Sequence, residues 1–305
     1  MFQIVKPDIN INFIQGRRAA FIVSGIVIAA GLISLISKGG PFYGIDFTGG
    51  LMIHVGVDEA VQISEVRESV EGLTETEISV QEFESEDGEY LLRVPTADEQ
   101  VGGGTAAMIK DALRETFSER GYDEKRTEIV GPRVGRDLRR RGILSVLFAT
   151  LVMGAYIAIR FQLRFGIGAG VALFHDVLVT VGALSLYNVE FNLSVVAALL
   201  TVVGYSVNDK VVVSDRIREN MRILRKTDTA TLINRSINET LSRTLLTTGT
   251  SLMVLFALFF FGGGVIHGFA FTLIVGLTAG TYSSVFIAAP IVEMWSSGEV
   301  EEYEK

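Results

Sequence analysis

The sequence predicts a polytopic α-helical membrane protein with six transmembrane helices and a folded α+β domain inserted after the first helix. Of its 305 residues, 49% are hydrophobic and only 20% are charged, a composition too apolar for a soluble fold of this length. Six apolar runs interrupt the polar sequence, and most are long enough to cross ~30 Å of hydrocarbon as helices. These runs are Ala19–Ser37, Gly142–Ile159, Gly166–Tyr187, Leu193–Val213, Leu245–Phe261 and Gly268–Ile291.

The charges of the loops predict how these spans are oriented. Six spans place both termini on one side of the membrane. Basic residues precede the first span (19–37), flank the connection after the second and are frequent in the loop 214–243 after the fourth. The positive-inside rule therefore predicts a cytoplasmic N-terminus (1–18), loop and C-terminal tail (293–305). An arginine cluster between residues 136 and 141 argues the other way, but it ends a segment of ~100 residues, and long domains translocate largely regardless of charge.

The segment 38–141 differs from the rest of the chain because it is polar, acidic and partly alternating in hydropathy. Strands are predicted at Leu51–Val57, Glu77–Phe83, Glu89–Val94 and Arg126–Val130, and helices at Ile63–Leu73 and Thr105–Arg120. The order β-α-β-β-α-β is that of a ferredoxin-like domain. We therefore expect an extracytoplasmic α+β domain with its connector here, followed by a five-helix transmembrane region at 142–292.

Two glycine-containing motifs border this domain. G-I-D-F-T-G-G leads into the first strand and V-G-P-R-V-G leads out of the last one; their distinctive residues are Gly44, Asp46, Gly49, Gly50, Gly131 and Pro132. We interpret the first motif as structural, because Asp46 can hydrogen-bond local backbone and the glycines permit positive φ before a strand. A ligand-binding loop is the alternative interpretation. The second motif is expected to form a rigid connector into the second span.

The fourth apolar run contains the main functional candidate. It begins as an uncharged helix and then includes Asn208, Asp209 and Lys210. A carboxylate within a spanning helix costs at least ~2.5 kcal/mol, so such residues usually face a bundle interior or a wet cavity and mark ion or proton pathways. Tyr205 and Ser206 precede Asp209 by about one turn, so we expect a single polar face on this helix. The alternative is a helix end, from which Lys210 reaches the membrane surface.

Two other spans contribute candidates. His175 and Asp176 are adjacent in the third span, and since neighbours on a helix point ~100° apart, only one of them can face the stripe of Asp209. Arg243 precedes the fifth apolar run, and Thr247 follows it by one turn. Arg243 is a natural counter-ion for Asp209, because a paired charge is cheaper to bury than a lone one. The alternative is an arginine that extends to the lipid headgroups.

The sixth span carries a ridge of small residues. Gly276 and Gly280 are four residues apart, and this spacing allows two spanning helices to pack closely. Tyr282 and Ser283 add hydroxyl groups beside the ridge. We expect close helix packing along this ridge.

Composition argues against several other classes of function. The net charge is −8, with acidic residues concentrated between 58 and 128 and at the C-terminus, so no nucleic-acid partner is expected. The chain has no cysteine, which excludes disulfides and thiolate metal ligands, and its three histidines are scattered. We therefore expect neither a metal centre nor a cofactor, and no catalytic constellation identifies an enzyme.

Five motifs spread over nearly the whole chain carry a family resemblance. They are G-I-D-F-T-G-G, V-G-P-R-V-G, the His175–Asp176 pair, G-Y-S-V-N-D-K-V-V-V-S-D-R-I-R-E-N and S-I-N-E-T-L-S-R-T. Together they resemble the SecF family, the smaller membrane subunits of SecD–SecF protein-export complexes in the RND superfamily. The resemblance implies a cell inner membrane protein that works with SecD at the SecYEG channel and uses a proton or sodium gradient to promote late steps of export.

The resemblance also carries implications for single residues and further partners. It implies roles in ion conduction for Asp209 and Arg243. It implies contact with the unfolded exported polypeptide and with membrane lipid, and it extends the expected partners to YidC and YajC. The sequence departs from the family's usual motif at Lys210, where a small or hydroxylated residue is usual. This extra charge can pair with Asp209, which leaves the coupling ion open.

Two other functions remain as alternatives. A passive scaffold of the export machinery would have the same spans and outer domain, but it would not need Asp209. An intramembrane aspartyl protease would use Asp176 and Asp209 as its paired carboxylates. The glycine-flanked aspartate of such enzymes is absent, and a protease does not explain the large inserted domain.

Overall fold

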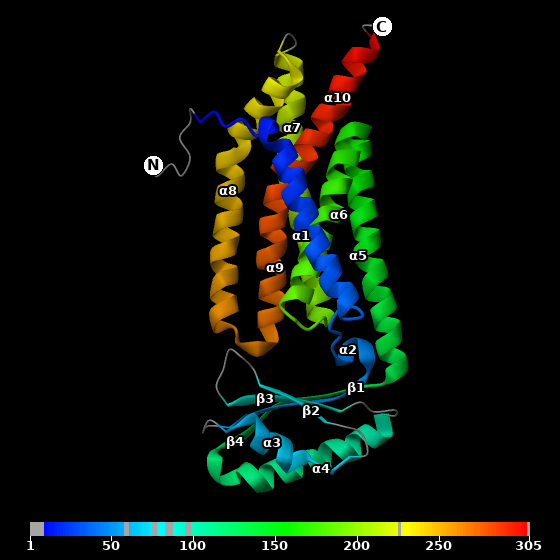
Figure 1. The fold of residues 1–305 in the computed structure, drawn as a ribbon, viewed down its shortest axis with the longest axis vertical. Helices are drawn as coiled ribbons and strands as arrows, with labels where there is room; N and C mark the ends of the chain where they lie inside the picture. Colours follow the sequence, from blue (N-terminus) through cyan, green and yellow to red (C-terminus); the bar gives the residue numbers. More distant parts are fainter. Residues whose placement is uncertain are drawn as a thin grey trace.

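The computed structural model describes residues 9–57, 61–74, 78–82, 88–94, 99–224 and 227–303 of the chain. Figure 1 shows a tall bundle of long helices with a small sheet lying across one end. The first turns of α1 (Arg17–Ser37) and the last helix, α10 (Ala289–Tyr303), lie at the other end of the bundle. The first and last described helices therefore begin and end on the same side, as an even number of spans requires.

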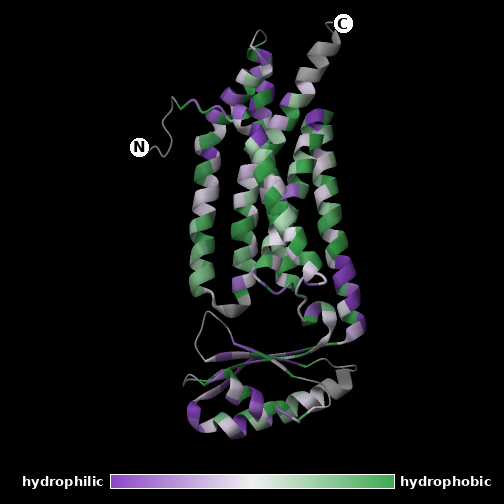
Figure 2. Ribbon diagram, viewed as in Figure 1, coloured by the Kyte–Doolittle hydropathy of each residue, from purple (hydrophilic) through white to green (hydrophobic). Residues whose placement is uncertain are grey.

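Among the described residues, six long helical segments form the bundle, and each is long and apolar enough to cross a membrane. Besides α1 they are α5 (Pro132–Arg160), α6 (Leu163–Leu186), α7 (Leu193–Ile223), α8 (Thr229–Phe261) and the pair of α9 (Gly263–Ser283) and α10, joined by a π-helical turn at Ser284–Ala288. Figure 2 shows hydrophobic residues along the middle of the bundle. The chain is thus a multi-pass membrane protein, as the sequence predicts.

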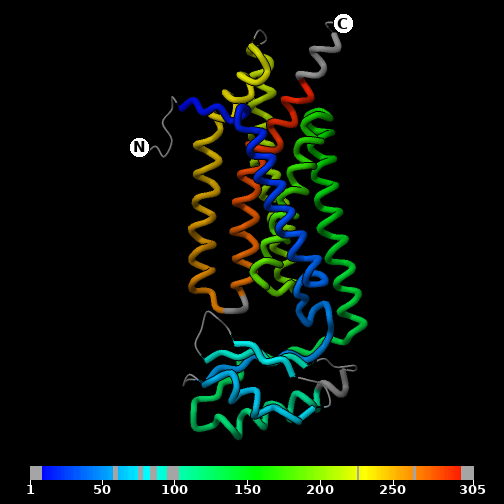
Figure 3. Tube along the Cα trace, viewed as in Figure 1, coloured from blue at the N-terminus to red at the C-terminus, as the bar shows by residue number. Residues whose placement is uncertain are grey.

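These helices divide into an inner and an outer group. In their most apolar stretch, 50% of residues are buried in α6, 56% in α7 and 61% in the last span, but only 17% in α1, α5 and α8. The outer helices expose large apolar side chains, such as Ile33 of α1 and Phe148 of α5, and lipid tails are equally apolar. Figure 3 shows α1 running obliquely across the bundle, where it packs on α6. The charged residues buried in the middle of the bundle, Asp176, Asp209 and Lys210, lie on the inner helices α6 and α7.

Two spanning helices begin well before their apolar runs. The helix α5 starts at Pro132 rather than Gly142, because proline is favourable at the first helical position. The helix α8 starts at Thr229 rather than Leu245, and Asp228 caps it by accepting hydrogen bonds from the amides of Ala230 and Thr231 at 3.2 and 2.9 Å. Hydropathy detects only the membrane-embedded part of such a helix. The expected loop 214–243 is consequently helical for most of its length.

The described residues of the inserted segment form a four-stranded antiparallel sheet with two helices packed on it. Its strands are β1 (Gly50–Val57), β2 (Ser79–Glu82), β3 (Glu89–Val94) and β4 (Tyr122–Val130), in the spatial order β2-β3-β1-β4. The helices α3 (Ile63–Val70) and α4 (Glu99–Phe117) cover the sheet face that points away from the bundle (Figure 1). The order of strands and helices agrees with the sequence prediction. Glu77 and Phe83, the expected ends of the second strand, lie outside the described residues.

The core of this domain follows from the alternation of β1. Leu51, Ile53 and Val55 are buried and pack in one cluster with Ile109 and Leu113 of α4. Alternate residues of a strand point to the same face, so this apolar set faces the helices. The opposite face lies toward the bundle (Figure 1).

The two glycine motifs pack against each other where the domain joins the bundle. Gly49 and Gly50 have φ of 75° and 131°, as expected for glycines before a strand. A Cβ atom added at Gly49 would lie 2.7 Å from Pro132 Cα, and one added at Gly135 would lie 2.9 Å from Gly49 N. The segments before β1 and after β4 therefore meet backbone to backbone, which supports the structural interpretation of both motifs.

The same junction holds the first residues of α7. Asp46 Oδ2 accepts a hydrogen bond from Leu193 N at 2.8 Å, so Asp46 caps this distant helix rather than local backbone. Glu190, in the connection from α6 to α7, forms an ion pair with Arg93 of β3. Burial raises the pKa of the Glu190 carboxyl, although the Arg93 guanidinium acts in the opposite direction. The sheet domain and the start of α7 are thus directly linked.

Candidate functional site

The inner helices α7 and α9 approach closely along a ridge of small residues. A Cβ atom added at Gly280 would lie 2.8 Å from Ser206 Oγ, and one added at Gly276 would overlap the side chain of Val202. Side chains larger than glycine would therefore push α9 away from α7. This confirms the predicted close packing along Gly276 and Gly280. It also brings the hydroxyl groups of α9 beside the polar residues of α7.

The polar residues of α7 lie on two faces of the helix. Ser206 and Lys210, one turn apart, contact α6 and α9. Tyr205 and Asp209, also one turn apart, contact α8 and α9 respectively. The expectation of a single polar face is therefore wrong. Adjacent residues point ~100° apart, which is enough to direct them to different neighbours inside a bundle.

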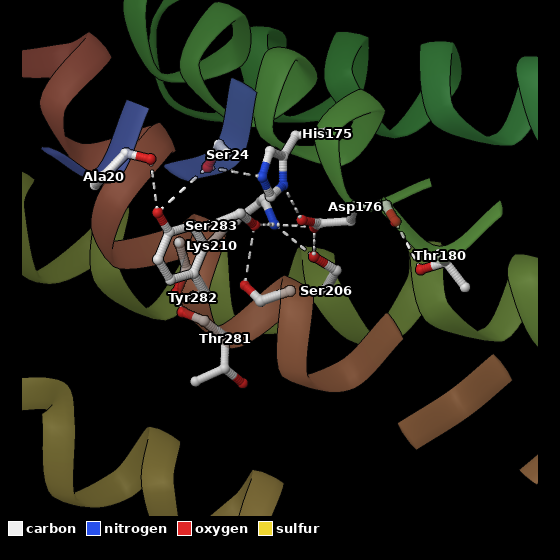
Figure 4. Close-up of polar contacts among 12 residues, drawn as sticks. Ala20, Ser24, His175, Asp176, Thr180, Ser206, Lys210, Thr281, Tyr282 and Ser283 are labelled. Carbon is white, nitrogen blue, oxygen red and sulfur yellow. Dashed lines mark hydrogen bonds and ion pairs between the residues drawn. The ribbon is translucent and has the colours of Figure 1, made fainter. Parts of the chain in front are cut away.

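Asp176 of α6 is the centre of a buried ion-pair network (Figure 4). Its Oδ2 atom lies 2.8 Å from Lys210 Nζ and accepts a hydrogen bond from Ser206 Oγ at 2.5 Å. Its Oδ1 atom lies 3.0 Å from His175 Nδ1. Asp176 and Lys210 are each only 1% exposed. So deep a burial of two charges is tolerated because they neutralise each other and have additional hydrogen-bond partners.

The network continues from His175 to α1. His175 Nε2 lies 3.1 Å from Ser24 Oγ, and Ser24 Oγ lies 3.2 Å from Tyr282 OH of α9. The rings of His175 and Tyr282 stack with their centroids 6.0 Å apart (Figure 4). Asp176 therefore faces α7 whereas His175 faces α1. Asp176 thus contacts Ser206 of the predicted stripe, as expected for one of the two residues, but neither residue has Asp209 among its described hydrogen-bond partners.

Asp209 occupies a separate buried position. Asp209 is 2% exposed, and its Oδ2 atom accepts a hydrogen bond from Thr281 Oγ1 of α9 at 3.3 Å. Thr281 Oγ1 lies 2.9 Å from Thr248 Oγ1 of α8. In the part of the chain that the structure describes, no cationic side chain forms an ion pair with this carboxylate. Asp209 is thus a buried carboxylate whose hydrogen-bond partner is a hydroxyl group.

Arg243 occupies an exposed position of α8. It lines a cavity of about 530 Å³ together with Arg160 of α5 and Asp215 of α7. This cavity lies at the end of the bundle opposite the sheet. Neither the expected Arg243–Asp209 pair nor the alternative Lys210–Asp209 pair is among the described ion pairs. The physical reason is that Lys210 points to Asp176 on α6, while Arg243 borders the cavity.

The remaining candidate residues either link α7 to α8 or lie at the surface of this chain. Tyr205 OH donates to Thr247 O at 3.0 Å and lies 3.0 Å from Ser251 Oγ. The hydroxyl of Thr247 donates within its own helix, to Arg243 O at 2.5 Å. Asn208 is exposed. The structure therefore gathers His175 and Asp176 into one network, buries Asp209 beside it, and leaves Asn208 and Arg243 at the surface of this chain.

Three residues that contribute hydrogen bonds to the buried polar groups are not evident from the sequence: Ser24, Thr248 and Thr281. Hydroxyl side chains in spanning helices commonly bond to the carbonyl one turn earlier, and Thr278 does so with Ile274 O at 2.7 Å. The sequence cannot distinguish such a residue from Thr281, which reaches Asp209. Only the packing of three helices separates the two roles.

The arrangement of the two buried carboxylates disfavours protease chemistry. The described residues include no group of three or more His, Asp or Glu side chains placed to hold a metal ion. An aspartyl protease needs two carboxylates close enough to share a proton. Here Asp176 is bound to Lys210, and Asp209 is bound to Thr281 on a different face of α7. This geometry does not form the required pair.

The fold and these contacts define a multi-pass membrane protein that buries charged groups within its inner helices, an arrangement typical of ion-driven transport. The family model for the C-terminal part of the protein export membrane proteins SecD and SecF matches residues 108–298. The chain belongs to the SecF family of protein translocase subunits and has a role in protein export.

Its relatives extend over nearly the whole chain. A protein translocase subunit SecF from Desulfurispirillum indicum is 44% identical, covering 97% of this chain and 95% of the relative. The SecF subunit from Vibrio alginolyticus is 41% identical over 95% of this chain and 91% of its own length.

Solved SecDF structures share the fold. The crystal structure of SecDF from Thermus thermophilus, described as a translocon-associated membrane protein, matches with a TM-score of 0.81 and 34% identity over 96% of this chain. A SecDF structure in a super-membrane-facing form matches with a TM-score of 0.70, also at 34% identity. This chain spans 40% and 41% of those two chains.

Proposed function

We propose that this chain is one subunit of an ion-driven export machine, which works with SecD and uses a proton or sodium gradient to promote late steps of translocation through the SecYEG channel. Its SecF relatives are named as protein translocase subunits, which supports the export role. One observation carries the ion-driven part. Asp209 is a buried carboxylate in a spanning helix with a hydroxyl partner, whereas the neighbouring Asp176 is neutralised by Lys210. Asp209 is therefore the carboxylate available to take up and release an ion.

The route from Asp209 to the sheet domain runs along α7. Binding of an ion at Asp209 alters the hydrogen bond between Asp209 and Thr281. It therefore also alters the packing of α7 on α9. The first residues of α7 contact Asp46 at the domain junction, and the preceding Glu190 contacts Arg93 of the sheet. Movement of α7 would thus be transmitted to the ferredoxin-like domain, which lies outside the cytoplasm in this proposal and holds the emerging unfolded polypeptide.

The partner assignment follows from the residues left at the surface. Thr201, Asn208 and Arg243 lie exposed on α7 and α8 of this chain. A homologous six-helix SecD subunit would cover such polar residues, as is usual for transporters built from two related halves. The two SecDF structures described above support SecD as the partner. YidC and YajC are proposed as further members of the assembly in the inner membrane.

The proposed function is tested by Asp209→Asn in membrane vesicles that contain SecD and the channel. A neutral amide is cheaper to bury than a carboxylate, so we expect the variant subunit to assemble with SecD. Because the titrating group is gone, stimulation of export by an imposed ion gradient should fall to the level seen without a gradient. The measurement is the amount of protease-protected substrate with and without the gradient.

Asp215→Asn serves as the matched control, because it is the same substitution on the same helix at an exposed position. It should retain the gradient-dependent stimulation. If Asp209→Asn vesicles respond to the gradient as strongly as this control, the chain is a passive scaffold and the ion-driven role is wrong.

The orientation can be tested separately, because the chain has no cysteine. Ser118 follows α4 in the sheet domain and Thr227 lies between α7 and α8, and both are exposed. In the proposed orientation, a membrane-impermeant thiol reagent added outside intact cells should label Ser118→Cys and not Thr227→Cys. Inside-out vesicles should give the reverse pattern. Labelling of both variants from one side would contradict the six-span topology.

A further inference from the structure

The ammonium group of Lys210 is held by three oxygen atoms that come from three different helices. Asp176 Oδ2 of α6 lies at 2.8 Å, Ser283 Oγ of α9 lies at 2.9 Å, and Ser206 Oγ of α7 is also in hydrogen-bond contact (Figure 4). An ammonium group has three protons to donate, and this arrangement uses all of them. The cation therefore sits in a complete shell of oxygen ligands where three helices meet.

The two hydroxyl groups present their lone pairs to this cation. Ser206 directs its own proton to Asp176 Oδ2 at 2.5 Å, and Ser283 directs its own proton to Gly280 O at 3.1 Å. Because each proton has an acceptor elsewhere, each hydroxyl oxygen is left to accept from or ligate a positive charge. The site thus offers one carboxylate oxygen and two hydroxyl oxygens, all of them neutral or anionic. None of these groups donates a proton toward the centre, so the ligand set suits a hard cation.

The surrounding packing keeps these oxygens in place. The absence of a side chain at Gly280 allows Ser206 to approach α9, since a Cβ atom there would lie 2.8 Å from Ser206 Oγ. Asp176 is held from its other side by His175 Nδ1 at 3.0 Å. A simple ion pair needs only the carboxylate, whereas here three side chains and a glycine converge on one point.

We propose that Asp176, Ser206 and Ser283 form a binding site for a monovalent cation, and that the tethered ammonium of Lys210 permanently fills it in place of Na⁺. The proposal goes beyond the proposed function, because it concerns a site on the face of α7 that does not carry Asp209. Its consequence for coupling rests on that function. With this site filled by a covalently attached cation, the protein takes no Na⁺ there, and coupling would use the ion bound at Asp209 alone.

The test is to remove the tethered cation and offer a free one. In Lys210→Ser, the shortened side chain vacates the position of the ammonium and leaves the three oxygen ligands around it. The purified full-length protein is heated in detergent in NaCl or in choline chloride at equal ionic strength. We expect Lys210→Ser to be less stable than the wild type in choline and to gain a saturable rise in Tm of roughly 2–4 °C with Na⁺. The wild type should show no such rise.

Two control variants make the result specific. Lys210→Met keeps the length of the side chain without its charge, so it leaves no room for Na⁺ and should gain nothing from NaCl. The double variant Lys210→Ser, Asp176→Asn lacks the carboxylate ligand and should also fail to respond. Binding of ²²Na⁺ to the same detergent samples should follow the same order.

Each outcome decides the proposal without reference to export. A Lys210→Ser protein that folds but responds to Na⁺ no more than Lys210→Met, or that unfolds equally in both salts, would show that the site is a structural ion pair only. Binding of ²²Na⁺ to the wild type that Asp176→Asn abolishes would also overturn it, because the site would then not be filled by Lys210. Failure of the gradient test on Asp209→Asn would leave the cation site itself untouched.

Discussion

Asp176→Asn is expected to lower the free energy of unfolding by about 3–5 kcal/mol, because it leaves the ammonium of Lys210 buried without a counter-charge. Lys210 is 1% exposed and 2.8 Å from Asp176 Oδ2, so water cannot replace the lost partner. Asparagine has the shape of aspartate, and the substitution therefore removes the charge while it leaves the packing nearly unchanged. The measurement is a denaturation curve of the purified protein in detergent.

A double variant separates the charge from other effects. Asp176→Asn combined with Lys210→Met removes both charges and should recover most of the lost stability, since a buried ion pair can often be replaced by neutral groups without loss. Asp209→Asn is the second comparison. Its carboxylate has a hydroxyl partner and no ion pair among the described residues, so it should lose far less stability. Equal losses for Asp176→Asn and Asp209→Asn would contradict the assignment of Lys210 to Asp176.

Gly182→Ala should destabilise the packing of α1 on α6. A Cβ atom at Gly182 would lie 2.9 Å from Gly31 Cα, which is backbone and cannot rotate away. The helices must separate, and overpacking of this kind costs about 1–3 kcal/mol. Separation would also weaken the contacts of Ser34 with Ser185 at 2.9 Å and of Ser24 with His175 at 3.1 Å. A lower Tm in detergent is the expected observation.

Gly170→Ala is the matched control on the same helix. A Cβ atom at Gly170 would have no atom within 4 Å. Both substitutions gain the same helix propensity, ~1 kcal/mol, so the difference between the two variants reports the contact with α1 alone. Gly170→Ala should be neutral or slightly stabilising. A Tm for Gly182→Ala equal to that of Gly170→Ala would mean that α1 can move without loss.

The sequence was sufficient for features that depend on local patterns. The apolar runs identified six spans, because the length of a helix across a membrane and the cost of polar groups within it are properties of one segment. The alternation of residues 51–57 and the turn residues around it indicated the strands of the sheet domain in their correct order. Gly276 and Gly280 indicated close packing, because a small-residue ridge has few other uses in a spanning helix. The burial of Asp209 followed from its position within an apolar run.

The tertiary structure alone decided which charges meet. Lys210 follows Asp209 in the chain, yet its side chain extends to Asp176 on another helix, and Arg243 borders a cavity instead of pairing with Asp209. Likewise, Thr281 reaches Asp209 while Thr278 bonds to its own helix. Direction on a helix changes by ~100° per residue, so a small rotation of one helix about its axis exchanges one partner for another. Hydropathy and spacing do not specify that rotation, which depends on the packing of α6, α7 and α9 around their glycines.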